Sequence, residues 1–155
     1  MEAGGGGSLG GCAAVSGGSG AAWVSAGNSG REIGAEGRAR SISKKTGHVV
    51  KHDLGGYSLK GKTSLSLATL TRLVHLNLSD SDFDGVPIPE FVGSFKMLRY
   101  LDLSHAGFGG AAPPQIGNLS RLVYLDLGSF EGPGITADNF HWVSKLTFVR
   151  YLDLG

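Results

Sequence analysis

The sequence predicts an α/β-type repeat solenoid, a right-handed coil with a concave parallel β-sheet, preceded by a disordered glycine-rich tail. Two observations lead to this fold class. One apolar sequence motif, here called the phrase, recurs five times at near-constant spacing within residues 46–155. In addition, 13 of the 27 glycines lie within residues 1–45. Repetition at a period of roughly 20–50 residues indicates stacked units, because one unit cannot bury its apolar face alone.

Residues 1–45 are predicted to be a disordered Gly/Ser/Ala-rich segment. They contain GGGGSLGGCAAVSGGSG, few branched apolar side chains, and five basic against three acidic residues. Such a segment cannot bury enough apolar surface to offset the entropy of ordering its glycines. The single cysteine, Cys12, excludes an intramolecular disulfide framework.

Residues 46–155 are predicted to hold about four repeats, the last one incomplete. The recurring phrases are VVKHDL, LVHLNL, LRYLDL, LVYLDL and VRYLDL, and their closing leucines are 24, 25, 24 and 27 residues apart. The spacing and the pattern L-x-x-L-x-L match the signature of leucine-rich repeats. Five matched phrases make this the strongest signal in the sequence.

Each phrase is expected to form a short strand, followed by a segment that returns to the start of the next strand. Side chains alternate along a strand, so Leu76 and Leu78 point into the core while His75 and Asn77 point outward. Prolines in residues 83–95 and 108–119 block strand pairing and shape these two returns. After the fourth phrase the return is longer, and Trp142 and Leu146 are its expected core anchors.

The full unit L-x-x-L-x-L-S-x-x-x-F-x-G-x-x-P-P/I-x-I/F-x-G-N/S-L/F-x-x-L resembles the plant-specific leucine-rich repeat. The stretches TGHVVKHDL, LKGKTSLSLATLTRLVHLNLS, IPEFVGSFKMLRYLDLS and PPQIGNLSRLVYLDLGS are similar to the N-terminal repeats of plant receptor-like proteins. The nearest kind perceives fungal xylanase or other microbial elicitors. The resemblance covers about residues 46–155.

The resemblance implies a non-enzymatic protein or peptide recognition module in defence signalling, without a cofactor. It implies a membrane receptor kinase as partner and the plasma membrane as location. Proteins of this kind have a secretory signal, more repeats and a membrane span. Neither a basic, apolar leader nor a stretch near the ~18 apolar residues of a span occurs here. We therefore expect a truncated form, and a non-functional remnant is the alternative.

Two columns of outward-pointing residues form the predicted binding surface. The first is Lys51, His75, Tyr100, Tyr124 and Tyr151, and the second is Asp53, Asn77, Asp102, Asp126 and Asp153. Stacked carboxylates raise one another's pKa, and Arg99 and Arg150 lie close enough in sequence to relieve this. Tyrosine and arginine are enriched at binding hot spots. The predicted ligand-contacting residues are His75, Arg99, Tyr100, Asp102, Tyr124, Asp126, Arg150 and Tyr151. The alternative is that LRYLDLS is the usual strand sequence of the family, present whether or not a given repeat contacts a ligand.

Two N-glycosylation sequons occur, at Asn77 and Asn118. A glycan at Asn118, in a return segment, would project away from the concave face, whereas one at Asn77 would crowd it. The alternative is that both stay unmodified.

The stretch GYSLKGKT, Gly56 to Thr63, matches the P-loop pattern G-x-x-x-x-G-K-[ST]. It makes nucleotide binding an alternative function, although the repeat period already explains its position. A net charge of +1 argues against nucleic-acid binding. The sequence also shows no combination of nucleophile, base and orienting residue, and no set of residues that predicts a metal site.

Overall fold

The computed structural model describes residues 12–14, 23–25, 40–42, 48–60, 65–129, 135–136 and 141–155. Its strands are β1 (Cys12–Ala14), β2 (Trp23–Ser25), β3 (Arg40–Ile42), β4 (Val49–Asp53), β5 (His75–Asn77), β6 (Tyr100–Asp102), β7 (Gly110–Ala111), β8 (Tyr124–Asp126), β9 (Ile135–Thr136) and β10 (Tyr151–Asp153). Its 3₁₀ helices are η1 (Leu65–Thr69), η2 (Glu90–Ser94), η3 (Pro114–Asn118) and η4 (Val143–Lys145).

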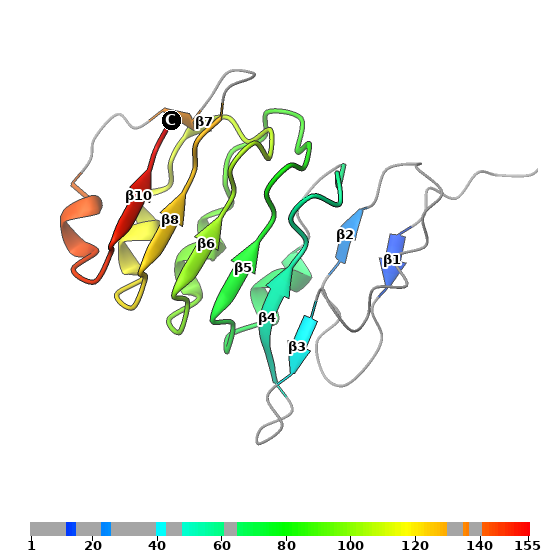
Figure 1. The fold of residues 1–155 in the computed structure, drawn as a ribbon, viewed down its shortest axis with the longest axis horizontal. Helices are drawn as coiled ribbons and strands as arrows, with labels where there is room; N and C mark the ends of the chain where they lie inside the picture. The colour runs from blue at the N-terminus through cyan, green and yellow to red at the C-terminus, as the bar shows by residue number, and fades with distance from the viewer. Residues whose placement is uncertain are drawn as a thin grey trace, which may run out of the picture.

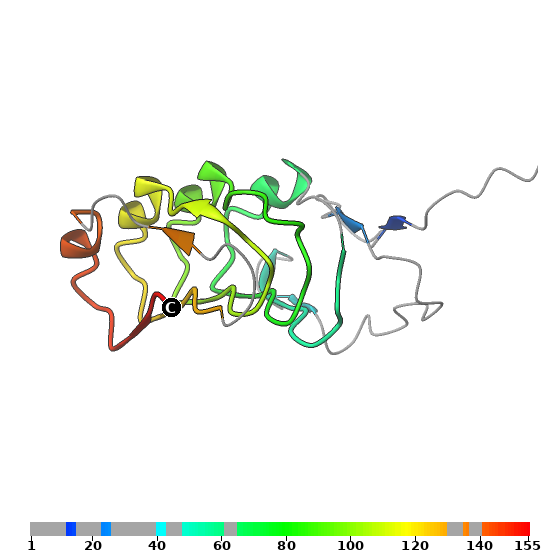
Figure 2. The same cartoon turned by 90° about the horizontal axis from the view of Figure 1, so that it is seen from above.

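A six-stranded sheet in the order β10-β8-β6-β5-β4-β3 runs along the molecule (Figure 1). Strands β4, β5, β6, β8 and β10 pair in parallel with no shift of register, so equivalent residues of successive repeats stand side by side. Strand β3 joins the edge in the antiparallel sense. The 3₁₀ helices form a second layer on the opposite side of the coil (Figure 2). The predicted leucine-rich-repeat solenoid is confirmed.

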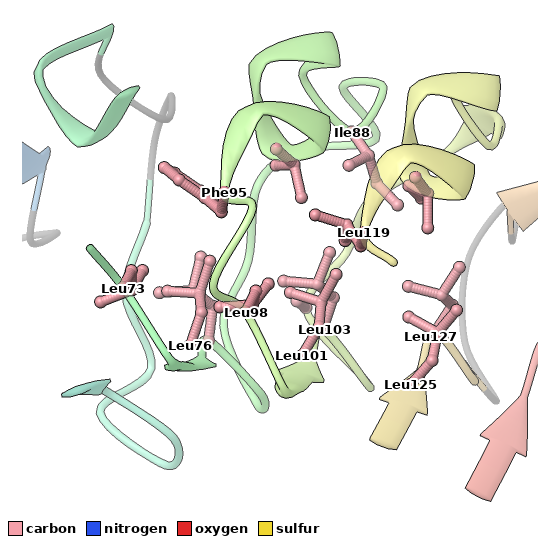
Figure 3. Close-up of a cluster of buried hydrophobic side chains, with 14 of the residues drawn as sticks. Leu73, Leu76, Ile88, Phe95, Leu98, Leu101, Leu103, Leu119, Leu125 and Leu127 are labelled. Atoms are coloured by element: carbon pink, nitrogen blue, oxygen red, sulfur yellow. The ribbon is translucent and has the colours of Figure 1, made fainter. Parts of the chain in front are cut away.

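The core lies between the sheet and the helix layer (Figure 3). The leucines of each phrase fill it: Leu73, Leu76 and Leu78 are at most 2% exposed. The rings of Phe83 and Phe108, one repeat apart, stack with their centroids 4.5 Å apart. Identical positions of neighbouring coils therefore pack on one another, which is how each unit buries an apolar face that it cannot bury alone.

In two of the return segments the 3₁₀ helix starts at a proline. Helix η2 starts after Pro89, whose φ is −65°, and η3 starts after Pro113 with Pro114 in its first turn. A fixed φ near this value and a missing N–H suit the first turn of a helix, where that N–H would have no partner. The longer return ends with η4, and the expected anchors Trp142 and Leu146 are buried, as predicted. A small parallel pair, β7 with β9, lies beside the returns.

Three short strands fall within the segment expected to be disordered. Strands β1 and β2 pair with each other, and β3 pairs with β4. At these strands the structure differs from the expectation, because a ladder uses backbone groups and needs no apolar side chain. The remainder of residues 1–45 lies outside the described residues, and the boundary near residue 45 stays a prediction.

Candidate ligand-binding surface

The first outward column of the sheet is an unbroken stack of rings. His75, Tyr100, Tyr124 and Tyr151, here called the aromatic ladder, lie side by side because their strands pair in register. Ring centroids are 4.2 Å apart for His75–Tyr100, 4.3 Å for Tyr100–Tyr124 and 4.3 Å for Tyr124–Tyr151, with interplanar angles of 10° or less. The ladder lies on the outer sheet face, turned away from the helix layer.

The second column, here called the carboxylate row, consists of Asp53, Asn77, Asp102, Asp126 and Asp153. Each of the last four closes the end of its own strand, because its Oδ1 accepts the backbone N–H two residues further on. These bonds measure 2.9 Å from Ser79, 3.1 Å from Ser104, 3.0 Å from Gly128 and 2.9 Å from Gly155. Asx side chains commonly stabilise turns in this way.

Asp102 and Asp126 lie in the outward column, but the expectation that they are exposed there is wrong. Both are buried, at 8% and 9% exposure. Their Oδ1 atoms serve the backbone, and their Oδ2 atoms accept the hydroxyls of Tyr100 at 3.0 Å and Tyr124 at 3.2 Å. The two carboxylates therefore act as supports beneath the ladder, and the rings form the accessible layer.

The tyrosine hydroxyls are held in their protonated, donating form. Burial and the Asp102 carboxylate raise the pKa of Tyr100 to about 12. Burial and the Asp126 charge also raise the pKa of Tyr124. At the end of the ladder, the Asp126 charge raises the pKa of Tyr151, whose hydroxyl lies 3.4 Å from Asp126 Oδ2. Ionisation of any of the three would place a phenolate against a carboxylate.

Opposite charges meet at the other end of the ladder. Asp53 Oδ2 lies 2.9 Å from Lys51 Nζ and 3.6 Å from His75 Nε2. Burial acts to raise the pKa of Asp53, but Lys51, His75 and the Gly55 N–H together lower it. Stacking of the carboxylates was expected to raise their pKa, and at Asp53 this expectation is wrong. Burial and the Lys51 charge lower the pKa of His75, which keeps its ring uncharged near neutral pH.

Arg99 and Arg150 do not neutralise the carboxylate row. Within the described ranges no ion pair joins either of them to a carboxylate. Both instead line an open pocket at the N-terminal ends of β6, β8 and β10, together with Arg121, Val123 and Phe148. The sequence prediction missed Arg121 and Phe148 because it considered only the strand columns. The sequence feature that could have identified them is their position, because Arg121 lies two residues before Val123 and Phe148 lies two residues before Arg150.

The two sequons lie in different surroundings. Asn118 is exposed at the last residue of η3. Asn77 is half-buried in the carboxylate row, and a Cβ placed on Gly55 would lie 2.5 Å from its Nδ2. The structure therefore leaves space around one amide and little around the other.

The P-loop match has a structural role in the part of it that the structure describes. The Gly56 N–H donates to the Ser79 carbonyl at 3.1 Å, and the Tyr57 N–H donates to the Leu54 carbonyl at 3.3 Å. Leu59 is buried in the core. Backbone N–H groups that cradle phosphate must be free to donate to it. Lys62 and Thr63 lie outside the described residues.

Metal and membrane sites are absent from the part of the chain that the structure describes. There, no three His, Cys, Asp or Glu side chains gather as a metal ion would need. The helices found there are too short and insufficiently apolar to span a bilayer.

Comparison with known proteins agrees with the repeat architecture. The family model described as Leucine Rich Repeat matches residues 97–119. Receptor-like protein EIX1 of Solanum lycopersicum is 38% identical over 125 residues, which cover 72% of this chain and 12% of that protein. The chain thus spans about an eighth of the length of this relative.

Solved structures with the same fold include two receptor kinase ectodomains. The leucine-rich-repeat ectodomain of SOBIR1 from Arabidopsis thaliana matches with a TM-score of 0.58 and 26% identity, over 76% of this chain and 67% of that one. The Arabidopsis receptor kinase HAESA, solved with the peptide hormone IDA and the co-receptor SERK1, matches with a TM-score of 0.52 and 26% identity. The match covers 62% of this chain and 16% of that one.

Proposed function

We propose, on the premise that this chain is a leucine-rich-repeat protein of the plant receptor-like kind, that its outer sheet face recognises a protein or peptide ligand. The aromatic ladder is the observation that carries the proposal. It presents four rings in one plane-stacked row, and Tyr151 is 43% exposed while His75, Tyr100 and Tyr124 are half-buried. Tyrosine supplies a large, amphipathic contact area of the kind found at binding hot spots.

The ladder is also held in place before any ligand arrives. Ring stacking fixes the planes, and hydrogen bonds to Asp102 and Asp126 fix the hydroxyls of Tyr100 and Tyr124. Binding to side chains that are already ordered loses less rotamer entropy than binding to mobile ones. A preorganised aromatic row therefore suits recognition and is not required by the core, which lies behind the sheet.

Similarity to known proteins supports the nature of the partners. EIX1 is a receptor-like protein, and HAESA was solved with a peptide hormone and a co-receptor. From the resemblance of the repeats to those of elicitor receptors, we extend the proposal to a protein or peptide ligand of the microbial elicitor class. The chain acts without catalysis at the cell surface, in defence signalling, beside a membrane receptor kinase.

The two alternative functions have less support. A non-functional remnant gives no reason for an intact ladder with aligned hydroxyl supports. Nucleotide binding at Gly56 to Thr63 conflicts with the N–H groups of Gly56 and Tyr57, which already donate to carbonyl oxygens.

A displayed random-peptide library, selected on the full chain, tests the proposal. We expect enriched peptides whose binding falls about tenfold in Tyr100→Ala and Tyr124→Ala, since each variant removes a central ring. Tyr57→Ala is the matched control, because Tyr57 is 39% exposed and lies outside the ladder. Circular dichroism melts establish that each variant is folded. Failure to enrich any peptide, or equal loss in all three variants, would contradict the proposal.

A further inference from the structure

An open pocket of about 540 Å³ lies at the N-terminal ends of β6, β8 and β10, outside the aromatic ladder. Its lining is Arg99, Arg121, Val123, Phe148 and Arg150. Here it is called the arginine pocket. Three of its five lining side chains carry a permanent positive charge.

The repeat itself builds this pocket. Two outward positions precede each strand, on either side of a core residue such as Leu98 or Leu122. The first position is Met97, Arg121 and Phe148 in successive coils, and the second is Arg99, Val123 and Arg150. Backbone bonds of 2.8 Å, from the Val123 N–H to the Arg99 carbonyl and from the Arg150 N–H to the Val123 carbonyl, hold the coils in register. Charged and apolar side chains therefore alternate across one small area.

Among the residues that the structure describes, no acidic side chain pairs with the three guanidinium groups. The ion pairs given by the described residues are Lys51–Asp53, Lys60–Asp82 and His75–Asp53, all on earlier repeats. Arg121 Nη1 contacts Met97 Sδ at 3.3 Å. Neighbouring strands are about 4.8 Å apart, so several unpaired cations share one pocket. Such a site is complementary to an anion, and arginine can hold a carboxylate with two parallel hydrogen bonds.

An apolar surface adjoins these charges. Phe148 is 65% exposed, and Val123 is half-buried beside it. The methylene stems of arginine also contribute apolar contact area. A group that fills this pocket well therefore combines a negative charge with an adjacent apolar side chain.

We propose that the arginine pocket binds an acidic segment of a peptide or protein partner. One Asp or Glu carboxylate accepts hydrogen bonds from the guanidinium groups, and a neighbouring apolar side chain packs on Val123 and Phe148. The inference rests on the proposed recognition function and adds the chemistry of the ligand. Nucleic acid is a poorer match, because three arginines in a chain of net charge +1 do not form the basic stripe that a phosphate backbone needs.

An array of heptapeptides tests this chemistry on the full chain. Each peptide carries one Asp or Glu beside a different apolar residue, and a matched array carries Asn or Gln. We expect acidic members to bind about tenfold more tightly than their amide counterparts, because the amide loses the charge-assisted bonds. Arg99→Gln, Arg121→Gln and Arg150→Gln should each weaken acidic binding, and added salt should weaken it in the wild type.

Arg72→Gln is the matched control, since Arg72 holds the position equivalent to Arg121 two coils earlier and does not line the pocket. An equal loss in Arg72→Gln, or acidic and amide peptides that bind alike, would overturn the inference. Displacement of the peptides by millimolar inorganic phosphate, but not by N-acetyl-glutamyl-phenylalanine amide, would assign the pocket to a phosphate group and would also overturn it.

The outcome is separable from that of the proposed function. Library peptides that depend on Tyr124 but bind equally to Arg150→Gln would disprove the acidic-segment inference and leave the recognition function standing. A chain that binds no peptide through either surface would contradict both.

Discussion

The Tyr124 hydroxyl donates to Asp126 Oδ2 at 3.2 Å, two residues along the same strand, while Asp126 Oδ1 accepts the Gly128 N–H at 3.0 Å. One carboxylate therefore supports a surface ring and closes the strand that carries it. Tyr100 and Asp102 repeat the arrangement one coil earlier. The candidate binding surface and the fold thus depend on the same side chains.

Replacement of Asp126 separates these two roles. Asp126→Ala leaves the half-buried Gly128 N–H without its charged acceptor, which should lower the free energy of unfolding by about 1–3 kcal/mol. Asp126→Asn should cost less, because Asn77 already fills the equivalent place and accepts the Ser79 N–H at 2.9 Å. Urea denaturation measures both. Equal losses in the two variants would show that the carboxylate charge, and not the hydrogen bond, stabilises the turn.

Tyrosine ionisation should be delayed in the folded protein. The pKa of Tyr100 is raised to about 12 from the ordinary value of 10.0. A raised acid pKa stabilises the fold fully below pH 10 and loses that contribution as the pH rises towards 12. We expect tyrosinate absorbance to develop at higher pH in native protein than in guanidinium chloride. Tyr100→Phe should remove part of the late absorbance, and coincident native and denatured curves would refute the arrangement.

Stability should decrease in mild acid because of His75. Its folded pKa lies below the ordinary 6.5, through burial and the Lys51 charge. Below pH 6.5 the His75 ring is therefore protonated in the unfolded chain but still neutral in the folded chain. Stability is lost as the pH falls through this range. His75→Phe keeps a ring against Tyr100 and should flatten the dependence of the urea midpoint on pH between neutrality and mild acid. An unchanged dependence in that variant would locate the sensitivity elsewhere.

Much of the fold followed from the sequence because the phrases are nearly identical and evenly spaced. Equivalent residues of successive repeats had to stand side by side, and this fixed the register between neighbouring strands. The aromatic ladder could therefore be predicted. The role of the carboxylate row could not be predicted. The alternation of side chains along a strand shows which side of the sheet a residue faces, but not which hydrogen bonds its carboxylate oxygens accept. A usable signal was present: Asn77, Asp102 and Asp126 are each followed two residues later by Ser or Gly, as in an Asx turn.

The arginine pocket and β3 are two further features that the sequence did not predict. Arg121 and Phe148 precede the strands, in a turn where the two-residue alternation of a strand no longer applies. Strand β3 pairs through backbone groups that every sequence possesses, so composition gave no indication of it.

Helix packing between coils should depend on Gly93. It is buried in η2, and a Cβ there would collide with the Gln115 carbonyl oxygen of η3. Gly117 in η3 repeats the approach, because a Cβ placed on it would lie 2.9 Å from the Trp142 carbonyl oxygen. Because backbone has to move, Gly93→Ala should destabilise the fold by about 1–3 kcal/mol. Glu90→Ala, an exposed change in the same helix, is the control, and chemical denaturation of both variants makes the comparison. Similar midpoints would show that the coils can separate at no cost.

Glycan attachment should differ between the two sequons. When the chain is passed through a eukaryotic secretory pathway with a leader fused to it, we expect Asn118 to carry a glycan and Asn77 to carry none. Asn118 is exposed at the end of η3, so a sugar there projects into solvent. At Asn77, Oδ1 accepts the Ser79 N–H and the Gly55 backbone packs against the amide nitrogen.

Oligosaccharide transfer can precede folding, so the folded population is the relevant one. A chain modified at Asn77 cannot place its amide against Gly55, and it would also carry a sugar beside the aromatic ladder. Peptide mass spectrometry of the folded, secreted fraction should therefore show one occupied site, removed by Asn118→Gln and unaffected by Asn77→Gln. Occupancy of Asn77 in that fraction would mean that the carboxylate row tolerates a displaced side chain, and the Asx turn at Ser79 would then not be needed to close β5.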